Sequence, residues 1–241
     1  MLDYVLRHKA GADESRPFWG KEGAYEAHRS VVGADGGRRA ASGLAWAAQV
    51  IRCERGSTFY HPCSGTNHAD IIRGTKFNDY IFGRGRNDTI YGFGSRSFRG
   101  PAQDTIRGGK GDDRLYGGKG LDNLSGEPGS DHLYGGVGAR DSLTGGPGDD
   151  YLTDGSGGGN HMAGGPDNDE YVGGPGSDSM LDFIYGNLAN EHNHMVGNGG
   201  YDQISGGAGD DTINVSDGIA GNDSLGAREG QDTCTSAMGE T

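Results

Sequence analysis

The residues of this chain that are best suited to chemistry are acidic side chains that recur on glycine-rich segments. At seventeen positions an Asp or Asn stands two residues before a side chain that can be buried. Eleven of the sixteen intervals between these positions are nine residues, two are ten, and the others are 16, 12 and 15. Carboxylates offer only oxygen ligands, so a regular series of them favours the binding of a hard cation. The polar members are Asp70, Asp79, Asp88, Asp104, Asp113, Asp122, Asp131, Asp141, Asp150, Asn160, Asp169, Asp178, Asn193, Asp202, Asp211, Asp223 and Asp232. Their apolar partners are Ile72, Ile81, Ile90, Ile106, Leu115, Leu124, Leu133, Leu143, Leu152, Met162, Tyr171, Met180, Met195, Ile204, Ile213, Leu225 and Cys234.

The stretch before each acid predicts a tight turn, and the stretch after it predicts a short strand. Residues 108–113, Gly-Gly-Lys-Gly-Asp-Asp, show the complete turn, with glycine at positions 1, 2 and 4. Glycine there allows positive φ, so several carbonyl oxygens can point inward beside the Asp. In residues 114–116, which follow, alternate side chains face opposite sides, and one apolar side chain faces inward. A single unit cannot bury that side chain, so two units form a coil of 18 residues and roughly nine coils must stack.

Composition divides the chain near residue 64. Residues 1–63 carry a net charge of +2 and residues 64–241 carry −15. An acidic chain with 50 glycines is ordinarily disordered, and an acidic linker is the competing interpretation. The fixed position of the Ile, Leu or Met residue favours a packed roll instead. Calcium would offset the repulsion between stacked carboxylates, and its binding free energy would then become folding free energy. Magnesium fits less well because it demands a tight octahedron, and the charge disfavours nucleic acid as a partner.

The iterated nonapeptide GGxGxDxUx resembles the RTX, or hemolysin-type, calcium-binding repeat over residues 65–235. This resemblance implies an all-β fold, a right-handed parallel β-roll, in which several calcium ions lie between glycine-rich turns of neighbouring coils. It also implies a set of metal-binding turn residues. These are Asp104, Gly108, Gly109, Gly111, Asp113, Gly117, Gly118, Gly120, Asp122, Gly126, Gly129, Asp131, Gly135, Gly136, Asp141, Gly145, Gly146, Gly148, Asp150, Gly164, Asp169, Gly173, Gly176, Asp178, Asp202, Gly206, Gly207, Gly209 and Asp211.

Departures from the repeat predict where binding weakens. Asn160 and Asn193 offer a neutral oxygen and no charge, so their sites should be weak or empty. Early repeats such as residues 74–79 lack the second and third glycines and carry Lys76, which favours stacking over tight metal binding. The insertions around residues 95–103 and 182–192 are expected to leave the roll as surface loops, because extra residues inside a coil would misplace the buried side chain.

The N-terminal part reads as a separate, largely disordered segment over residues 1–52. Residues 38–49 resemble a signal peptide, and a merely Ala-rich linker is the alternative. Residues 53–64 are similar to small loops that precede the repeats in some secreted actinobacterial RTX-like proteins. A disulfide between Cys53 and Cys63 would cap the open end of the roll, whereas free thiols are the alternative. Cys234 occupies an inward repeat position as a small core residue, or pairs with a cysteine beyond residue 241. Residues 236–241 form a tail.

These observations predict a calcium-binding protein without catalytic machinery, secreted or at the cell surface. Calcium-driven folding would give a rigid roll for structural, adhesive or display roles, with cell-surface or matrix components as partners. One alternative is the C-terminal calcium-binding or secretion module of a larger extracellular hydrolase or toxin. Another is an ice-binding solenoid, but the residue after each acid varies too much to form a flat ladder of one type. No segment is apolar and long enough to span a membrane.

Overall fold

The computed structural model describes residues 48–54, 57–58, 60–94, 102–138, 140–155, 157–182, 191–215 and 223–236. The predicted low-order segment before residue 48, with nearly all of the signal-like stretch, lies outside these ranges, as do residues 237–241 of the tail. Within them, no helix has the length and hydropathy that crossing a bilayer requires.

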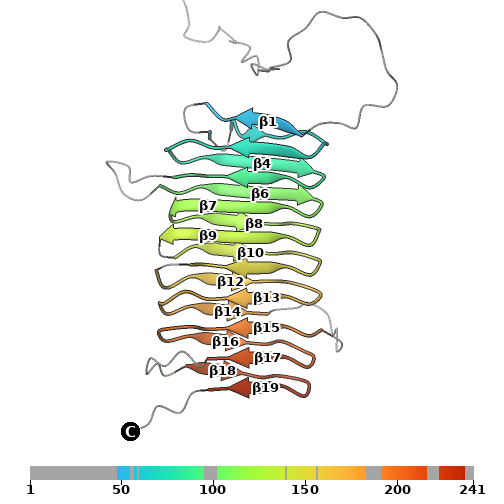
Figure 1. The fold of residues 1–241 in the computed structure, drawn as a ribbon, viewed down its shortest axis with the longest axis vertical. Coiled ribbons are helices and arrows are strands. Elements are labelled where there is room, and N and C mark those ends of the chain that lie inside the picture. The colour runs from blue at the N-terminus through green and yellow to red at the C-terminus, as the bar shows by residue number, and fades with distance from the viewer. Residues whose placement is uncertain are drawn as a thin grey trace, which may run out of the picture. The chain divides into compact units, whose positions relative to one another are not determined.

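The roll consists of two parallel β-sheets, and successive strands along the chain alternate between them (Figure 1). Each coil therefore contributes one strand to each sheet, which confirms the predicted parallel β-solenoid. The ten-stranded sheet contains, in spatial order, β1 (Gln49–Arg52), β3 (Asp70–Arg73), β5 (Thr89–Tyr91), β7 (Arg114–Gly120), β9 (His132–Gly138), β11 (Tyr151–Thr153), β13 (Glu170–Val172), β15 (His194–Val196), β17 (Thr212–Asn214) and β19 (Thr233–Thr235). The nine-stranded sheet contains, likewise in order, β18 (Ser224–Gly226), β16 (Gln203–Ser205), β14 (Ser179–Leu181), β12 (His161–Ala163), β10 (Ser142–Thr144), β8 (Asn123–Ser125), β6 (Thr105–Lys110), β4 (Tyr80–Gly85) and β2 (Cys63–Ser64).

The core is a stack of single apolar side chains, one from each strand from β3 to β17. Ile72, Ile90 and Leu115 are aligned across β3, β5 and β7, and all three are fully buried. The predicted partners from Ile72 to Ile213 are all buried. Because the pairing is parallel and in register, each inward residue lies above its equivalent in the previous coil. The nine-residue spacing therefore predicted the core correctly.

The same register aligns residues on the outer face. The rings of Tyr91, Tyr116 and Tyr134 stack along β5, β7 and β9, with centroid separations of 4.9 and 4.7 Å. These separations match the spacing of neighbouring strands, so this row of aromatic rings follows directly from the coil repeat. The rings cover part of the outer face of the ten-stranded sheet.

Glycine at turn position 1 serves a different purpose from the one that the sequence predicted. Gly109 and Gly111, at positions 2 and 4, have φ values of 114° and 121°, as expected. Gly108, at position 1, has no positive φ. A Cβ there would overlap the carboxylate of Asp113 and lie 2.8 Å from the carbonyl oxygen of Gly126. Position 1 therefore requires glycine because the chains approach closely, and not because of its φ angle.

The N-terminal end of the roll differs from its predicted limit, and near the C-terminal end Cys234 differs from its predicted burial. Gln49–Arg52 forms β1 and pairs in register with Asp70–Arg73, so the roll begins upstream of residue 65. Cys53 and Cys63 form the expected disulfide. At the other end, Cys234 is a free and exposed thiol and not a core residue. It lies in the last strand, where no described coil covers it.

Candidate metal centre

The repeat acids form two ladders inside the roll, one on each side. In each ladder the backbone N–H of one member donates to the side-chain oxygen of the equivalent residue in the next coil. Asp113 donates to Oδ1 of Asp131 at 2.7 Å, and Asp122 donates to Oδ1 of Asp141 at 2.6 Å. The ladder beside the ten-stranded sheet contains Asp70, Asp88, Asp113, Asp131, Asp150, Asp169, Asn193, Asp211 and Asp232. The other contains Asp79, Asp104, Asp122, Asp141, Asn160, Asp178, Asp202 and Asp223.

The second carboxylate oxygen of most ladder members has no hydrogen-bond donor. This Oδ2 atom is buried and unpartnered in Asp88, Asp104, Asp113, Asp122, Asp131, Asp141, Asp150, Asp169 and Asp211. Leaving one buried acceptor without a partner costs about 1–3 kcal/mol, and more for a charged group. Nine such oxygens in one thin roll are consistent with a site for cations, which would offset this cost.

Backbone carbonyl oxygens line the turns next to these carboxylates. The carbonyl oxygen of Gly111 lies directly against Gly129 of the next coil on the same side, and that of Gly118 lies against Gly136. Hydrogen bonds fix the spacing of the turns, as where the N–H of Gly109 donates to the carbonyl of Gly126 at 3.0 Å. A side chain at position 2 or 4 would overlap a carbonyl oxygen of the neighbouring turn, so glycine keeps the gap between turns clear.

Burial strongly disfavours the charged form of the ladder acids. Desolvation raises the pKa of Asp113 to about 7, that of Asp150 to about 8 and that of Asp169 to about 9. Hydrogen bonds from the preceding coil lower each value, and the neighbouring carboxylates raise it again. Among the groups that shift these three pKa values there is no protein cation to balance an ionised carboxylate. A bound divalent cation would supply the missing positive charge and stabilise the ionised form.

This donor set fits a hard cation. No three His, Cys, Asp or Glu side chains within the described ranges converge closely enough to hold a metal by themselves. An ion between two turns would therefore take carbonyl oxygens together with the unpartnered carboxylate oxygens. Calcium accepts six to eight oxygens in flexible geometry, as such turns provide, whereas zinc and copper prefer nitrogen or sulfur.

The two Asn positions donate side-chain hydrogen bonds that an ionised Asp could not donate. The Nδ2 group of Asn160 donates to Oδ1 of Asp178 at 2.9 Å, and the N–H of Gly174 donates to Oδ2 of Asp178 at 3.0 Å. Asn193 donates from Nδ2 to Oδ2 of Asp182 at 3.0 Å. An amide thus supplies a donor where a carboxylate would need a cation. Asp178, a predicted ligand, has both oxygens hydrogen-bonded within the protein.

Three buried acids lie outside the seventeen repeat positions. Asp154 and Asp182 occupy turn position 1, where other repeats have glycine, and Glu191 ends the second insertion. The prediction that residues 182–192 form a surface loop is wrong at both ends, because Asp182 is 1% exposed and Glu191 is 4% exposed. Oδ1 of Asp182 and Oε2 of Glu191 have no hydrogen-bond partner. Acids in the glycine position of the repeat could have signalled this. Residues 95–101 and 183–190 lie outside the described ranges.

Comparison with protein families identifies the repeat. The RTX calcium-binding nonapeptide repeat model matches residues 64–92, 100–133, 107–140, 127–157, 154–180 and 189–219, which together cover more than half of the chain. The chain belongs to this RTX family. Its nonapeptide repeats are calcium-binding, and the matched ranges include every predicted ligand from Asp104 to Asp211. A search of curated proteins gives no significant match.

Proposed function

We propose that this RTX protein is a structural calcium-binding protein whose roll folds when calcium enters the gaps between neighbouring turns. Each ion would take an unpartnered Oδ2 together with carbonyl oxygens from the turns above and below it. Asp113, Asp122 and Asp131 are the central ligands in this proposal. The observation that carries it is the series of buried, unpartnered carboxylate oxygens beside glycine turns in a repeat of a calcium-binding family.

The proposed setting is outside the cell, where calcium is abundant. Extracellular calcium modules work at roughly 0.1–1 mM, far above cytosolic calcium. The disulfide between Cys53 and Cys63 supports the same setting because such bonds persist in oxidising compartments. RTX repeat proteins are also typically secreted. A rigid calcium-filled roll would suit adhesion, matrix or surface display.

We further propose that the roll has no catalytic role of its own. The ladder carboxylates face one another inside the roll and are almost fully buried, so a substrate cannot reach them. His192 and His194, the one histidine pair close in sequence among the described residues, have separate partners. His192 Nδ1 lies 3.1 Å from the carbonyl of Asp210, and His194 Nδ1 lies 3.9 Å from Glu170. A calcium module attached to an enzymatic partner domain is the second candidate, supported by the family alone.

Calorimetric titration of the full chain with calcium tests the proposal. We expect saturable binding of several ions, and at most weak binding of magnesium under the same conditions. Asp113→Asn should lower the number of ions or their affinity, because it replaces a buried ligand. Asp112→Asn is the matched control, since Asp112 is exposed in the same turn. Absence of calcium binding, or equal effects of the two substitutions, would contradict the ligand assignment.

A further inference from the structure

The first two turns of the roll form hydrogen bonds to their acids that most later turns lack. Thr66 and Thr75 occupy turn position 2, where complete turns such as residues 108–113 have glycine. The N–H and the hydroxyl of Thr75 both donate to Oδ2 of Asp79, at 2.6 and 2.9 Å. Thr66 makes the same two bonds to Oδ2 of Asp70, at the same distances. The oxygen that is unpartnered in most later turns is thus occupied here by the chain's own donors, as it also is in Asp178.

The backbone explains why threonine can do this. Position 2 has no positive φ in these two turns, whereas Gly109 has a φ of 114°. The N–H of Gly109 therefore points along the roll to the carbonyl of Gly126, while that of Thr75 points to its own Asp. Each early turn closes on itself. Oδ2 of its Asp accepts two hydrogen bonds within the turn and is therefore no longer free to bind a cation.

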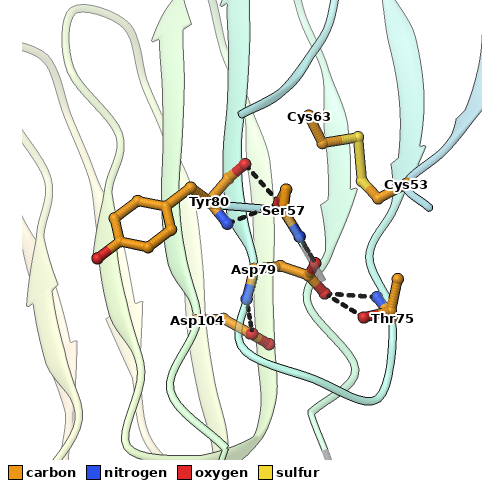
Figure 2. The surroundings of a disulfide bond; sticks show 7 residues. All are labelled: Cys53, Ser57, Cys63, Thr75, Asp79, Tyr80 and Asp104. Carbon is orange, nitrogen blue, oxygen red and sulfur yellow. Dashed lines mark hydrogen bonds between the residues drawn. A yellow bond between two sulfur atoms is a disulfide. The ribbon is translucent and has the colours of Figure 1, made fainter. Parts of the chain in front are cut away.

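Ser57 completes the same arrangement at the end of the nine-stranded sheet (Figure 2). Its N–H donates to Oδ1 of Asp79 at 2.7 Å, which is the bond that an Asp of the preceding coil makes elsewhere. Its hydroxyl donates to the carbonyl of Tyr80 at 2.8 Å and accepts from the N–H of Tyr80 at 2.7 Å. Both oxygens of Asp79 are therefore satisfied. Asp70 is less complete, because its Oδ1 is buried without a partner.

The disulfide holds the Ser57 segment in place. Cys53 and Cys63 are joined, and both pack against the end of the apolar core. The N–H of Cys53 donates to the carbonyl of Arg73 at 2.8 Å, and Cys63 pairs with Ile81 in β4. Closing this loop removes conformational freedom from the unfolded chain, which favours the folded end without any ion. We call the described residues of 49–85, which include β1 to β4, the N-terminal cap.

We propose that the N-terminal cap retains its structure without calcium and is the template on which calcium adds the later coils in order. This inference rests on the proposed calcium-driven folding. Thr66 and Thr75 would then determine where calcium dependence begins along the chain. A preformed strand edge lets each new coil pair at once, as in other stacked repeats. The opposite end offers no such template within the described residues, since Cys234 is exposed and Leu225 is 37% exposed.

Hydrogen–deuterium exchange of the oxidised full chain, followed by mass spectrometry, tests the inference. In chelator, amides of residues 65–82 should stay protected while those of residues 104–150 exchange freely; calcium should protect both. Equally fast exchange of both segments in chelator would overturn the cap. Strong protection of residues 104–150 in chelator would instead contradict calcium-driven folding itself, so the two failures are distinguishable.

Thr75→Val sharpens this test because it removes the hydroxyl donor and keeps the shape of the side chain. In chelator it should speed exchange of residues 65–82 at least about tenfold, as expected for loss of a hydrogen bond to a charged group. Thr144→Val, on the exposed face of β10, is the matched control and should leave that segment unchanged. Equal exchange in the two variants would overturn the role of Thr75.

Pulsed exchange after calcium is added tests the direction of assembly. Residues 83–138 should become protected before residues 191–235. Simultaneous removal of the disulfide by Cys53→Ser and Cys63→Ser should slow this first phase and abolish protection of the cap in chelator. Earlier protection of the C-terminal coils would overturn the proposed order.

Discussion

The N-terminal cap and the central coils from Asp104 to Asp150 share one core but differ in the hydrogen bonds that their acidic side chains accept. From β3 in the cap through the central coils, a single apolar side chain per strand is fully buried and lies above its equivalent in the previous coil. In the cap, Asp79 accepts hydrogen bonds at both oxygens. In the central coils, each ladder Asp accepts one ladder hydrogen bond and keeps a buried, unpartnered Oδ2. Hydrogen bonds can thus close a turn, and the proposed function assigns a cation to the turns that lack them.

A change of pH should have the largest effect on the folding of the calcium-free central coils. Burial raises the pKa of Asp122 and Asp131 to about 7 and that of Asp104 to about 8, above the ordinary value of 3.8. A raised pKa means that protons bind the folded state more tightly, so protonation stabilises it. That stabilisation is complete near pH 4 and is lost as the pH rises through about 7–8. Decalcified protein should therefore gain β-structure between pH 8 and pH 5, as measured by far-UV circular dichroism.

The calcium-loaded protein should respond to pH in the opposite sense. Calcium requires ionised carboxylates, so its binding should weaken as the pH falls below about 7. If acid neither folded the decalcified chain nor weakened calcium binding, the buried carboxylates would not be the groups that control folding.

Core substitutions should have the next largest effect, and the effect should be alike in the two regions. Ile81→Ala in the cap and Leu115→Ala in the central coils each leave a cavity at a fully buried position. Each should lower the free energy of unfolding by about 2–5 kcal/mol in saturating calcium. Urea denaturation measures this. A loss confined to one region would contradict a continuous core.

Substitution of the acids should separate the regions. Asp122→Asn removes charge next to the proposed ion and should raise the calcium midpoint severalfold, with little effect once calcium saturates. Asp79→Asn places an amide group against N–H and hydroxyl donors, and should cost about 1–3 kcal/mol at any calcium concentration. Calcium titrations of both variants, followed by thermal unfolding at saturation, distinguish the two outcomes. The same calcium dependence in both variants would remove the distinction between the regions.

The smallest expected effect concerns glycine at turn position 1. Gly108→Ala places a Cβ against Asp113 and Gly126, and should cost about 1–3 kcal/mol. Gly155→Ala is the control, because no atom lies within 4 Å of a Cβ there and its φ is not positive. It should change stability by less than about 0.5 kcal/mol. Equal stability of the two variants in urea would show that close approach does not explain the glycine.

Much of this structure could be predicted because the apolar residue and the turn recur at fixed positions in the nine-residue repeat. A nine-residue interval with one apolar side chain indicates a coil of two repeats, so the core followed. Ser57 could not be predicted, because its role depends on a loop closed by Cys53 and Cys63 and not on the repeat. Burial of Glu191 could not be predicted either, since it ends an insertion and stacking brings it inside, whereas Asp182 stands at a glycine position of the repeat that could have signalled its burial. The exposure of Cys234 could not be predicted because it depends on whether another coil covers the strand, which the repeat position does not indicate.

Far-UV circular dichroism of the full chain at pH 8, first in chelator and then in about 2 mM calcium, tests calcium-driven folding most directly. In chelator we expect a mostly unfolded spectrum with a small β contribution from the cap, and on calcium addition a cooperative shift to β-structure. Magnesium at the same concentration should not produce that shift. A full β spectrum in chelator, unchanged by calcium, would contradict the account.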